Sequence, residues 1–98
     1  MATITNERIT ELESLGFKRW TKGSMDRLYI NAEQLGLVCE YYNSGNVRHA
    51  TFKGEQISNR RAGSMKWSKT YIDVKTGMVY SDSETLKQAA AELAGIEQ

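Results

Sequence analysis

The spacing of apolar residues changes twice along the chain, and this change constrains the fold more than any other feature of the sequence. From Lys18 to Tyr80 the apolar side chains follow a period of two, which is the period of a strand with one buried face. The segments on either side follow the spacing of a helix that buries one side. Because helices and strands are segregated in this way, we expect an α+β fold in which the two terminal helices cover one face of a small antiparallel sheet.

The first helix carries a start signal and a stop signal. Thr5 or Asn6 can cap its N-terminus, and Gly16 can end it in a left-handed conformation. Phe17 then falls where it can cover Leu12. The apolar side of this helix consists of Ile9, Leu12 and Leu15.

The last helix is specified in the same way. Residues 81–84 form a Ser-Asp-Ser-Glu capping box, and Gly95 ends the helix. Its apolar residues are Leu86, Ala89, Ala90 and Leu93. Two shorter helical segments are expected in the middle of the chain: a helix within residues 58–67, which starts at a capping serine, and a single turn over residues 31–34, which an asparagine can cap.

We expect about five strands, four of which form two hairpins. The first hairpin joins Leu37–Tyr42 to Val47–Phe52 through a turn rich in Asn, Ser and Gly. The second joins Tyr71–Val74 to Met78–Tyr80 through a three-residue loop with a glycine. The fifth strand is Arg27–Ile30, where apolar and polar side chains alternate.

The composition is that of one folded domain, which we expect to span residues 1–98. The longest apolar run is far shorter than a spanning helix, and the first seven residues lack the pattern of a secretory signal. A single cysteine and a single histidine cannot form an internal disulfide or a usual zinc site. We therefore expect a cytoplasmic protein that needs no cofactor, metal ion or membrane.

Catalytic chemistry has little support in the sequence. The glycines are isolated at single turns, so they do not form a phosphate-binding loop. His49 is the side chain that ordinarily titrates near neutral pH, but no motif supplies a nucleophile beside it. Cys39 shares a strand face with Leu37 and Tyr41 and is typical of a small core residue. We therefore expect a protein that is not an enzyme, and an enzyme using His49 is the least supported of three hypotheses.

Charge is distributed unevenly along the chain. Residues 17–80 hold eleven Lys or Arg and five Asp or Glu, a net charge of +6. Residues 1–16 and 81–98 together hold two basic and seven acidic residues, a net charge of −5. The middle of the chain presents a strong positive field if the acidic helices lie on the opposite side of the molecule, and a weak one if they lie beside it.

Two basic clusters, at residues 18–22 and 60–69, each contain a tryptophan. Cations attract phosphates and an aromatic ring can stack on an unpaired base, so this combination favours a nucleic-acid surface. We expect a binding module whose partner is nucleic acid or an acidic, nucleic-acid-associated protein. The candidate binding residues are Lys18, Arg19, Trp20, Lys22, Arg48, Arg60, Arg61, Lys66, Trp67 and Lys69. In the alternative interpretation both tryptophans belong to the core and the cations form an ordinary solvated rim.

The tyrosines suggest a second kind of partner. All five fall in expected strands, and the adjacent Tyr41 and Tyr42 must point to opposite faces of a sheet. At least one of them therefore lies away from the helices, and Tyr42 is the candidate for a protein interface. The second hypothesis is accordingly an accessory or inhibitor protein, of the bacterial, phage or mobile-element type, that forms a stoichiometric complex through an open sheet face or an edge strand.

Overall fold

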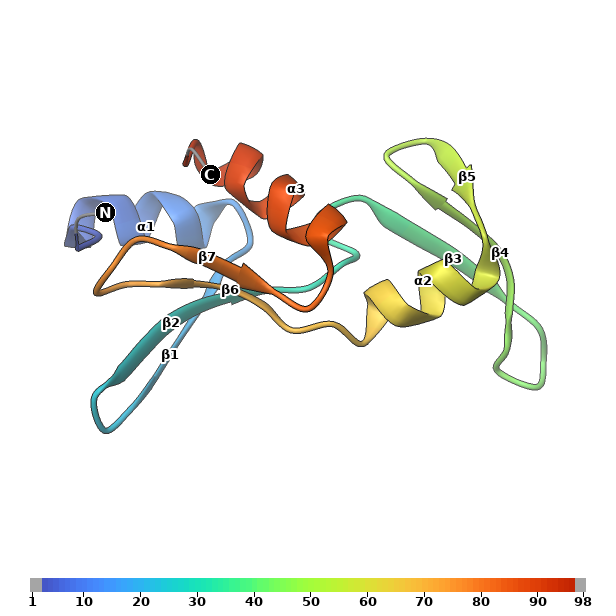
Figure 1. Ribbon diagram of the computed structural model, residues 1–98, viewed down its shortest axis with the longest axis horizontal. Coiled ribbons are helices and arrows are strands. Elements are labelled where there is room, and N and C mark those ends of the chain that lie inside the picture. The colour runs from blue at the N-terminus through green and yellow to red at the C-terminus, as the bar shows by residue number, and fades with distance from the viewer. Residues whose placement is uncertain (1–2, 97–98) are drawn as a thin grey trace.

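A computed structural model of the protein describes residues 3–96 and shows three helices and seven antiparallel strands in two sheets (Figure 1). One sheet has the strand order β1-β2-β6-β7, and the other has the order β3-β4-β5. The two sheets lie at opposite ends of a molecule that measures 42 × 26 × 21 Å. In chain order the elements are α1 (Asn6–Ser14), β1 (Lys18–Lys22), β2 (Met25–Ile30), β3 (Leu37–Tyr41), β4 (Val47–Phe52), β5 (Glu55–Ile57), α2 (Asn59–Lys66), β6 (Thr70–Asp73), β7 (Val79–Ser81) and α3 (Glu84–Ala94).

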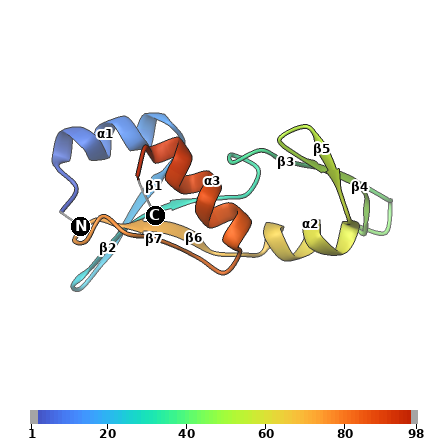
Figure 2. The ribbon, with the colours of Figure 1, turned by 45° about the horizontal axis from the view of Figure 1, so that its top comes forward.

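The four-stranded sheet has one covered face and one open face. Both terminal helices, α1 and α3, lie on the same side of it (Figure 2), as the sequence predicts. The strand residues that face the helices are buried, and they alternate with more exposed residues along each strand. The buried residues are Leu28, Ile30, Ile72 and Val79. The helices contribute Ile9, Leu12, Leu86 and Ala90 to the same apolar cluster.

The three-stranded sheet is covered by α2, which contacts β3 and β4. Ala62 and Met65 of the helix and Leu37 and Ala50 of the strands are buried there. These residues belong to one hydrophobic cluster with the core under α1 and α3. The two sheets are therefore parts of one folded unit.

The number of strands and sheets differs from the expectation of about five strands in a single sheet. The two predicted hairpins and the strand over residues 27–30 are present. The two strands that the sequence does not predict are β1 and β5. All five residues of β1 are exposed, so the strand carries no alternation of apolar and polar side chains, and β5 is only three residues long.

The chain leaves the first sheet at the predicted turn over residues 31–34. The backbone N–H of Gln34 donates to Asn31 Oδ1 at 3.1 Å, and that of Asn31 donates to Gln34 Oε1 at 3.3 Å. Gly36 follows with φ of 120°, a conformation that favours glycine. The turn redirects the chain, and β3 pairs with β4 rather than with β2.

The helix ends follow the sequence signals, with small differences. The Thr5 side chain caps α1 by accepting from the Arg8 N–H, and Gly16 adopts φ of 113°. The N–H of Phe17 donates to the Leu12 carbonyl at 3.2 Å, which completes the glycine stop. The cap of α3 is Ser83 rather than Ser81.

Two leucines that the helical spacing places on apolar faces are instead partly exposed. Leu15 is 42% exposed because α1 ends at Ser14 and the chain turns away at this cap residue. Leu93 is 37% exposed and lines a shallow pocket beside Leu35. The small residues Ala91 and Ala94 are the buried positions in the last turns of α3.

Candidate nucleic-acid interface

The open face of the four-stranded sheet carries a row of aromatic side chains. The register places Lys18, Tyr29, Tyr71 and Tyr80 opposite one another on the four adjacent strands. Their neighbours Leu28, Ile72 and Val79 are buried under the helices. Because successive side chains in a strand point to opposite faces, the three tyrosines lie on the face away from α1 and α3. We call Tyr29, Tyr71 and Tyr80 the tyrosine row.

The rings of the tyrosine row touch one another across the strands. The ring centroids of Tyr29 and Tyr71 are 5.2 Å apart, and those of Tyr71 and Tyr80 are 5.3 Å apart with the rings stacked at 25°. Trp20, from the edge strand, meets Tyr29 edge to face at 6.2 Å. Trp20 and Tyr80 are each 41% exposed, so both ends of the aromatic series are open to a ligand.

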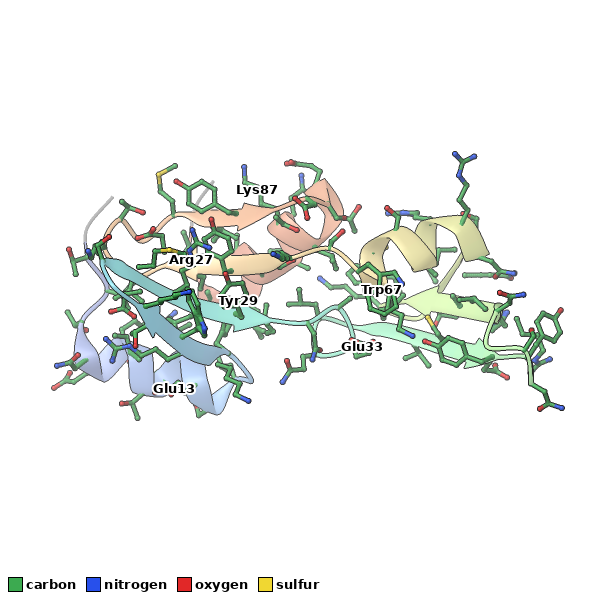
Figure 3. The ribbon with its side chains drawn as sticks, turned by 90° about the horizontal axis from the view of Figure 1, so that it is seen from below. Glu13, Arg27, Tyr29, Glu33, Trp67 and Lys87 are labelled. Carbon is green, nitrogen blue, oxygen red and sulfur yellow. The ribbon has the colours of Figure 1, made fainter. Side chains whose placement is uncertain are left out.

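Arg27 joins two rings of the row. Its guanidinium donates to the Tyr29 hydroxyl at 2.9 Å and lies 4.3 Å from the centre of the Tyr71 ring. The hydrogen bond to Tyr29 raises the pKa of Arg27 above its ordinary value. Figure 3 shows Arg27 and Tyr29 together on the strands of this sheet, with α3 behind. The arginine therefore adds a positive charge to the aromatic surface and restricts the ring positions.

The open face has more cations than acids. Lys18, Trp20 and Lys22 alternate along β1 on the side of the tyrosine row. Neither lysine forms an ion pair within residues 3–96. The acid on this face is Asp73, opposite Arg27, and its carboxylate accepts the N–H groups of Lys75 and Thr76 in the following turn.

The uneven charge distribution raises the question whether the acidic helices lie beside the basic residues or opposite them. The two helices lie on the other side of the sheet from the tyrosine row. Glu7, Glu11 and Glu13 belong to α1, and Glu84 and Glu92 belong to α3. The sheet and its buried layer separate these carboxylates from the tyrosine row. The basic open face and the acidic helices therefore lie on opposite sides of the sheet.

Two predicted binding cations are paired with acids. Arg19 lies on the helix side of β1, opposite Leu28, and its guanidinium donates to both carboxylate oxygens of Asp26 at 2.7 and 3.0 Å. This hydrogen bonding raises the pKa of Arg19 and lowers that of Asp26. Arg48 pairs with Glu40 on the neighbouring strand. Both cations are less available to a phosphate than Lys18 and Lys22.

A second aromatic and basic group lies beside α2, and we call Tyr41, Lys66 and Trp67 the α2 cluster. The ammonium of Lys66 donates to the Tyr41 hydroxyl at 2.8 Å and lies 5.4 Å from the Trp67 ring. The bond to Tyr41 raises the pKa of Lys66. Trp67 is 80% exposed and is visible from the same direction as Arg27 and Tyr29 (Figure 3).

The remaining predicted cations of this region are divided between two sides of α2. Arg60 is exposed and lies seven residues before Trp67, so both share the outer face of the helix. Arg61 points to the other side and donates to Thr85 Oγ1 of the α3 region at 2.9 Å. Lys69 follows the helix, lies just before β6 and lines the same pocket as Lys18.

The exposure of the tryptophans contradicts the interpretation that both belong to the core. The sequence also did not single out Arg27 or the tyrosine row as binding residues. A usable signal was present, because Tyr29 and Tyr71 each stand next to strongly apolar strand residues and must point the other way. What the sequence lacks is the order β1-β2-β6-β7, which brings the residues of two distant hairpins onto one face.

The other residues considered for chemistry lie outside this face. His49 is opposite Glu40 in the three-stranded sheet, Cys39 is a half-buried free thiol that packs against the core, and Tyr42 is exposed in the β3–β4 turn. In the described part of the chain no three His, Cys, Asp or Glu residues are grouped to hold a metal ion. Among residues 3–96 no helix has the length and apolar character needed to cross a bilayer. No protein-family model, curated protein or solved structure matches the chain.

Proposed function

We propose that the protein binds single-stranded nucleic acid on the open face of its four-stranded sheet and does so without catalysing a reaction. The observation that carries this proposal is the tyrosine row, which Trp20 and Arg27 extend into a continuous aromatic and cationic surface. Unpaired bases stack on such rings, and each stacking contact is worth about 1–3 kcal/mol. Lys18 and Lys22 along β1 are in position to meet the phosphates.

The surface suits a single strand better than a duplex. Stacking on a protein ring requires a base that is free of its own stack, which a single strand offers and a duplex does not. Reading a duplex through the major groove uses a protruding helix or β-ribbon. On the open face the described chain presents aromatic side chains and lysines, and the terminal helices lie on the other side of the sheet.

The test is a fluorescence anisotropy titration of labelled oligothymidylate and of a duplex of equal length at two salt concentrations. We expect the single strand to bind more tightly and its affinity to fall as salt rises. Tyr71→Ala removes the central ring of the row and is expected to weaken binding about 5- to 150-fold, the equivalent of one lost stacking contact. Tyr71→Phe keeps the ring and should bind nearly as the wild type does.

The matched control is Tyr42→Ala, because Tyr42 is an exposed tyrosine of the β3–β4 turn, remote from the row. Circular dichroism of each variant checks that the fold is retained. If folded Tyr71→Ala binds the single strand as tightly as Tyr42→Ala does, the tyrosine row is not the binding surface. Absence of oligonucleotide binding at low salt would end the proposal.

A second candidate is the stoichiometric protein complex, which the geometry of β1 favours. This strand is an edge of its sheet, and all five of its residues are exposed. Such an edge can accept a strand of a partner through backbone hydrogen bonds. A stable complex with one protein, lost when Thr21 is changed to Pro at this edge, together with no affinity for bare oligonucleotides, would favour this candidate over the first.

A further inference from the structure

An open pocket of about 390 Å³ lies at the end of the tyrosine row, where the chain crosses from one sheet to the other. Tyr29 forms part of its wall, together with Gly16 and the turn that begins at Asn31. Lys18 lines it from β1, and Lys69 lines it from the residue just before β6. Its volume falls in the range of pockets that hold small ligands.

The polar side chains of the pocket are mostly hydrogen-bond donors. Lys18 and Lys69 form no ion pair with a carboxylate in the part of the chain that the structure describes. Asp82 accepts the backbone N–H of Lys69 at 3.3 Å, but Asp82 does not line the pocket. Two cations that line a pocket whose lining residues include no carboxylate attract an anion.

The capping arrangement of the turn adds two more donors. The side-chain oxygens of Asn31 and Gln34 accept the backbone N–H groups of the turn. This fixes the orientation of both amides, because only the oxygen can accept. Their NH₂ groups are left without a partner among residues 3–96, and both residues line the pocket. The pocket thus presents two ammonium groups and two amide donors beside an aromatic ring.

We propose that this pocket is a phosphate subsite, which holds a phosphate of a nucleotide whose base stacks on Tyr29. Tetrahedral phosphate oxygens accept several hydrogen bonds at once, and charged donors bind them most strongly. The pocket lies between the tyrosine row and the α2 cluster, so the same phosphate can belong to a strand that continues toward Trp67. The assignment of the phosphate to a nucleic-acid strand rests on the proposed function. The existence of an anion site in the pocket does not depend on it.

The first experiment uses inorganic phosphate alone and follows the side-chain NH₂ signals of Asn31 and Gln34 by ¹⁵N–¹H correlation spectroscopy at constant ionic strength. We expect saturable shifts of these signals in the wild-type protein. In Lys18→Ala/Lys69→Ala the saturable shift should be lost. It should persist in Lys75→Ala/Lys87→Ala, which removes the same number of charges outside the pocket.

Two results would overturn the subsite: phosphate that produces no saturable shift in the wild type, or shifts that are reduced equally in the two double variants. The second result would mean that the shifts report a general attraction of phosphate to the positively charged protein and not binding in the pocket. Because no nucleic acid is present, neither result depends on the proposed function. An oligonucleotide that binds the tyrosine row while phosphate fails here would remove the subsite and leave the proposed function in place.

A second arm identifies the source of the phosphate. Oligothymidylates of about six nucleotides are titrated with hydroxyl ends, with a 5′-phosphate and with a 3′-phosphate. If the pocket holds a strand end, one terminal phosphate raises the affinity about tenfold or more, and Lys18→Ala/Lys69→Ala abolishes that gain. If it holds an internal phosphate, the hydroxyl-ended oligonucleotide itself loses about tenfold more affinity in this variant than in Lys75→Ala/Lys87→Ala.

Discussion

At the scale of single residues, the open face depends on tyrosines that fulfil two requirements at once. Each ring contacts a neighbouring ring of the row, and each keeps a polar hydroxyl at its tip. Arg27 uses one of these hydroxyls as an acceptor. Phenylalanine at position 29 would keep the stacking but leave Arg27 without this partner, so the residue type matters as well as the ring.

A pH-dependent contribution to stability is expected from Asp26, whose pKa is lowered by its hydrogen bonds with Arg19. A carboxyl with a lowered pKa in the folded state stabilises the fold above its unfolded pKa of about 3.9. That contribution is lost as the pH falls through the lower, folded pKa. Asp26→Asn should therefore lower the urea midpoint at pH 7, and the difference from wild type should shrink toward pH 2.5. A difference that stays constant over this range would contradict the ion pair's role.

At the scale of elements, the helices and hairpins were predictable because their signals are local. The serine caps of α2 and α3 and the glycine stop of α1 are set within a few residues of each helix end. β1 was not predictable, because an edge strand with five exposed residues has no apolar alternation. The division into two sheets depends on the pairing of β2 with β6. The paired residues are about forty positions apart in the chain, and no local pattern determines which strand β2 pairs with.

Two glycine-to-alanine substitutions test how the helices are specified. The substitution is expected to lower the free energy of unfolding at one position and to raise it at the other. Gly16 has φ of 113°, where a side chain is strained, and an added Cβ would lie 2.8 Å from Gln34 Nε2. Gly16→Ala should lower the free energy of unfolding by about 1–2 kcal/mol. Gly63 lies within α2, and no atom would come within 4 Å of an added Cβ.

Gly63→Ala should therefore raise the free energy of unfolding by about 0.5–1 kcal/mol, through the higher helix propensity of alanine. Urea unfolding of both variants at pH 7 measures the two effects. Stabilisation by Gly16→Ala would show that the left-handed stop after α1 is not formed. Destabilisation by Gly63→Ala would show that α2 is not helical at this position.

At the scale of the whole molecule, the sheet separates charge. The acidic helices lie on one side of the four-stranded sheet, and Lys18 and Lys22 of β1, which form no ion pair within residues 3–96, lie on its open side. At physiological salt, interactions between exposed charges are screened over about 8 Å. A ligand on the open face therefore meets the lysines and is shielded from the carboxylates, although the protein as a whole is nearly neutral.

Single charge changes on the two sides should have unequal effects on oligonucleotide binding. Lys22→Gln removes an open-face cation, and the slope of log affinity against log salt should fall by about 0.7, as expected for one phosphate contact of a single strand. Glu7→Gln alters the charge by one unit in the first turn of α1, on the helix side of the sheet, and should leave the slope unchanged. Titrations at four salt concentrations measure both slopes. Equal and opposite effects would mean that only the net charge matters.

The most direct test of the central claim is to map the surface that a single strand covers. Oligothymidylate of about eight nucleotides is titrated into ¹⁵N-labelled protein, and the backbone amides and the two tryptophan indole N–H signals are followed. We predict shifts of the Trp20 indole and of amides in β1, β2, β6 and β7 around the tyrosine row, with the outer turns of α1 and α3 unchanged. Shifts confined to the helices or to the β3–β4 turn, with the Trp20 indole unmoved, would contradict binding on the open face.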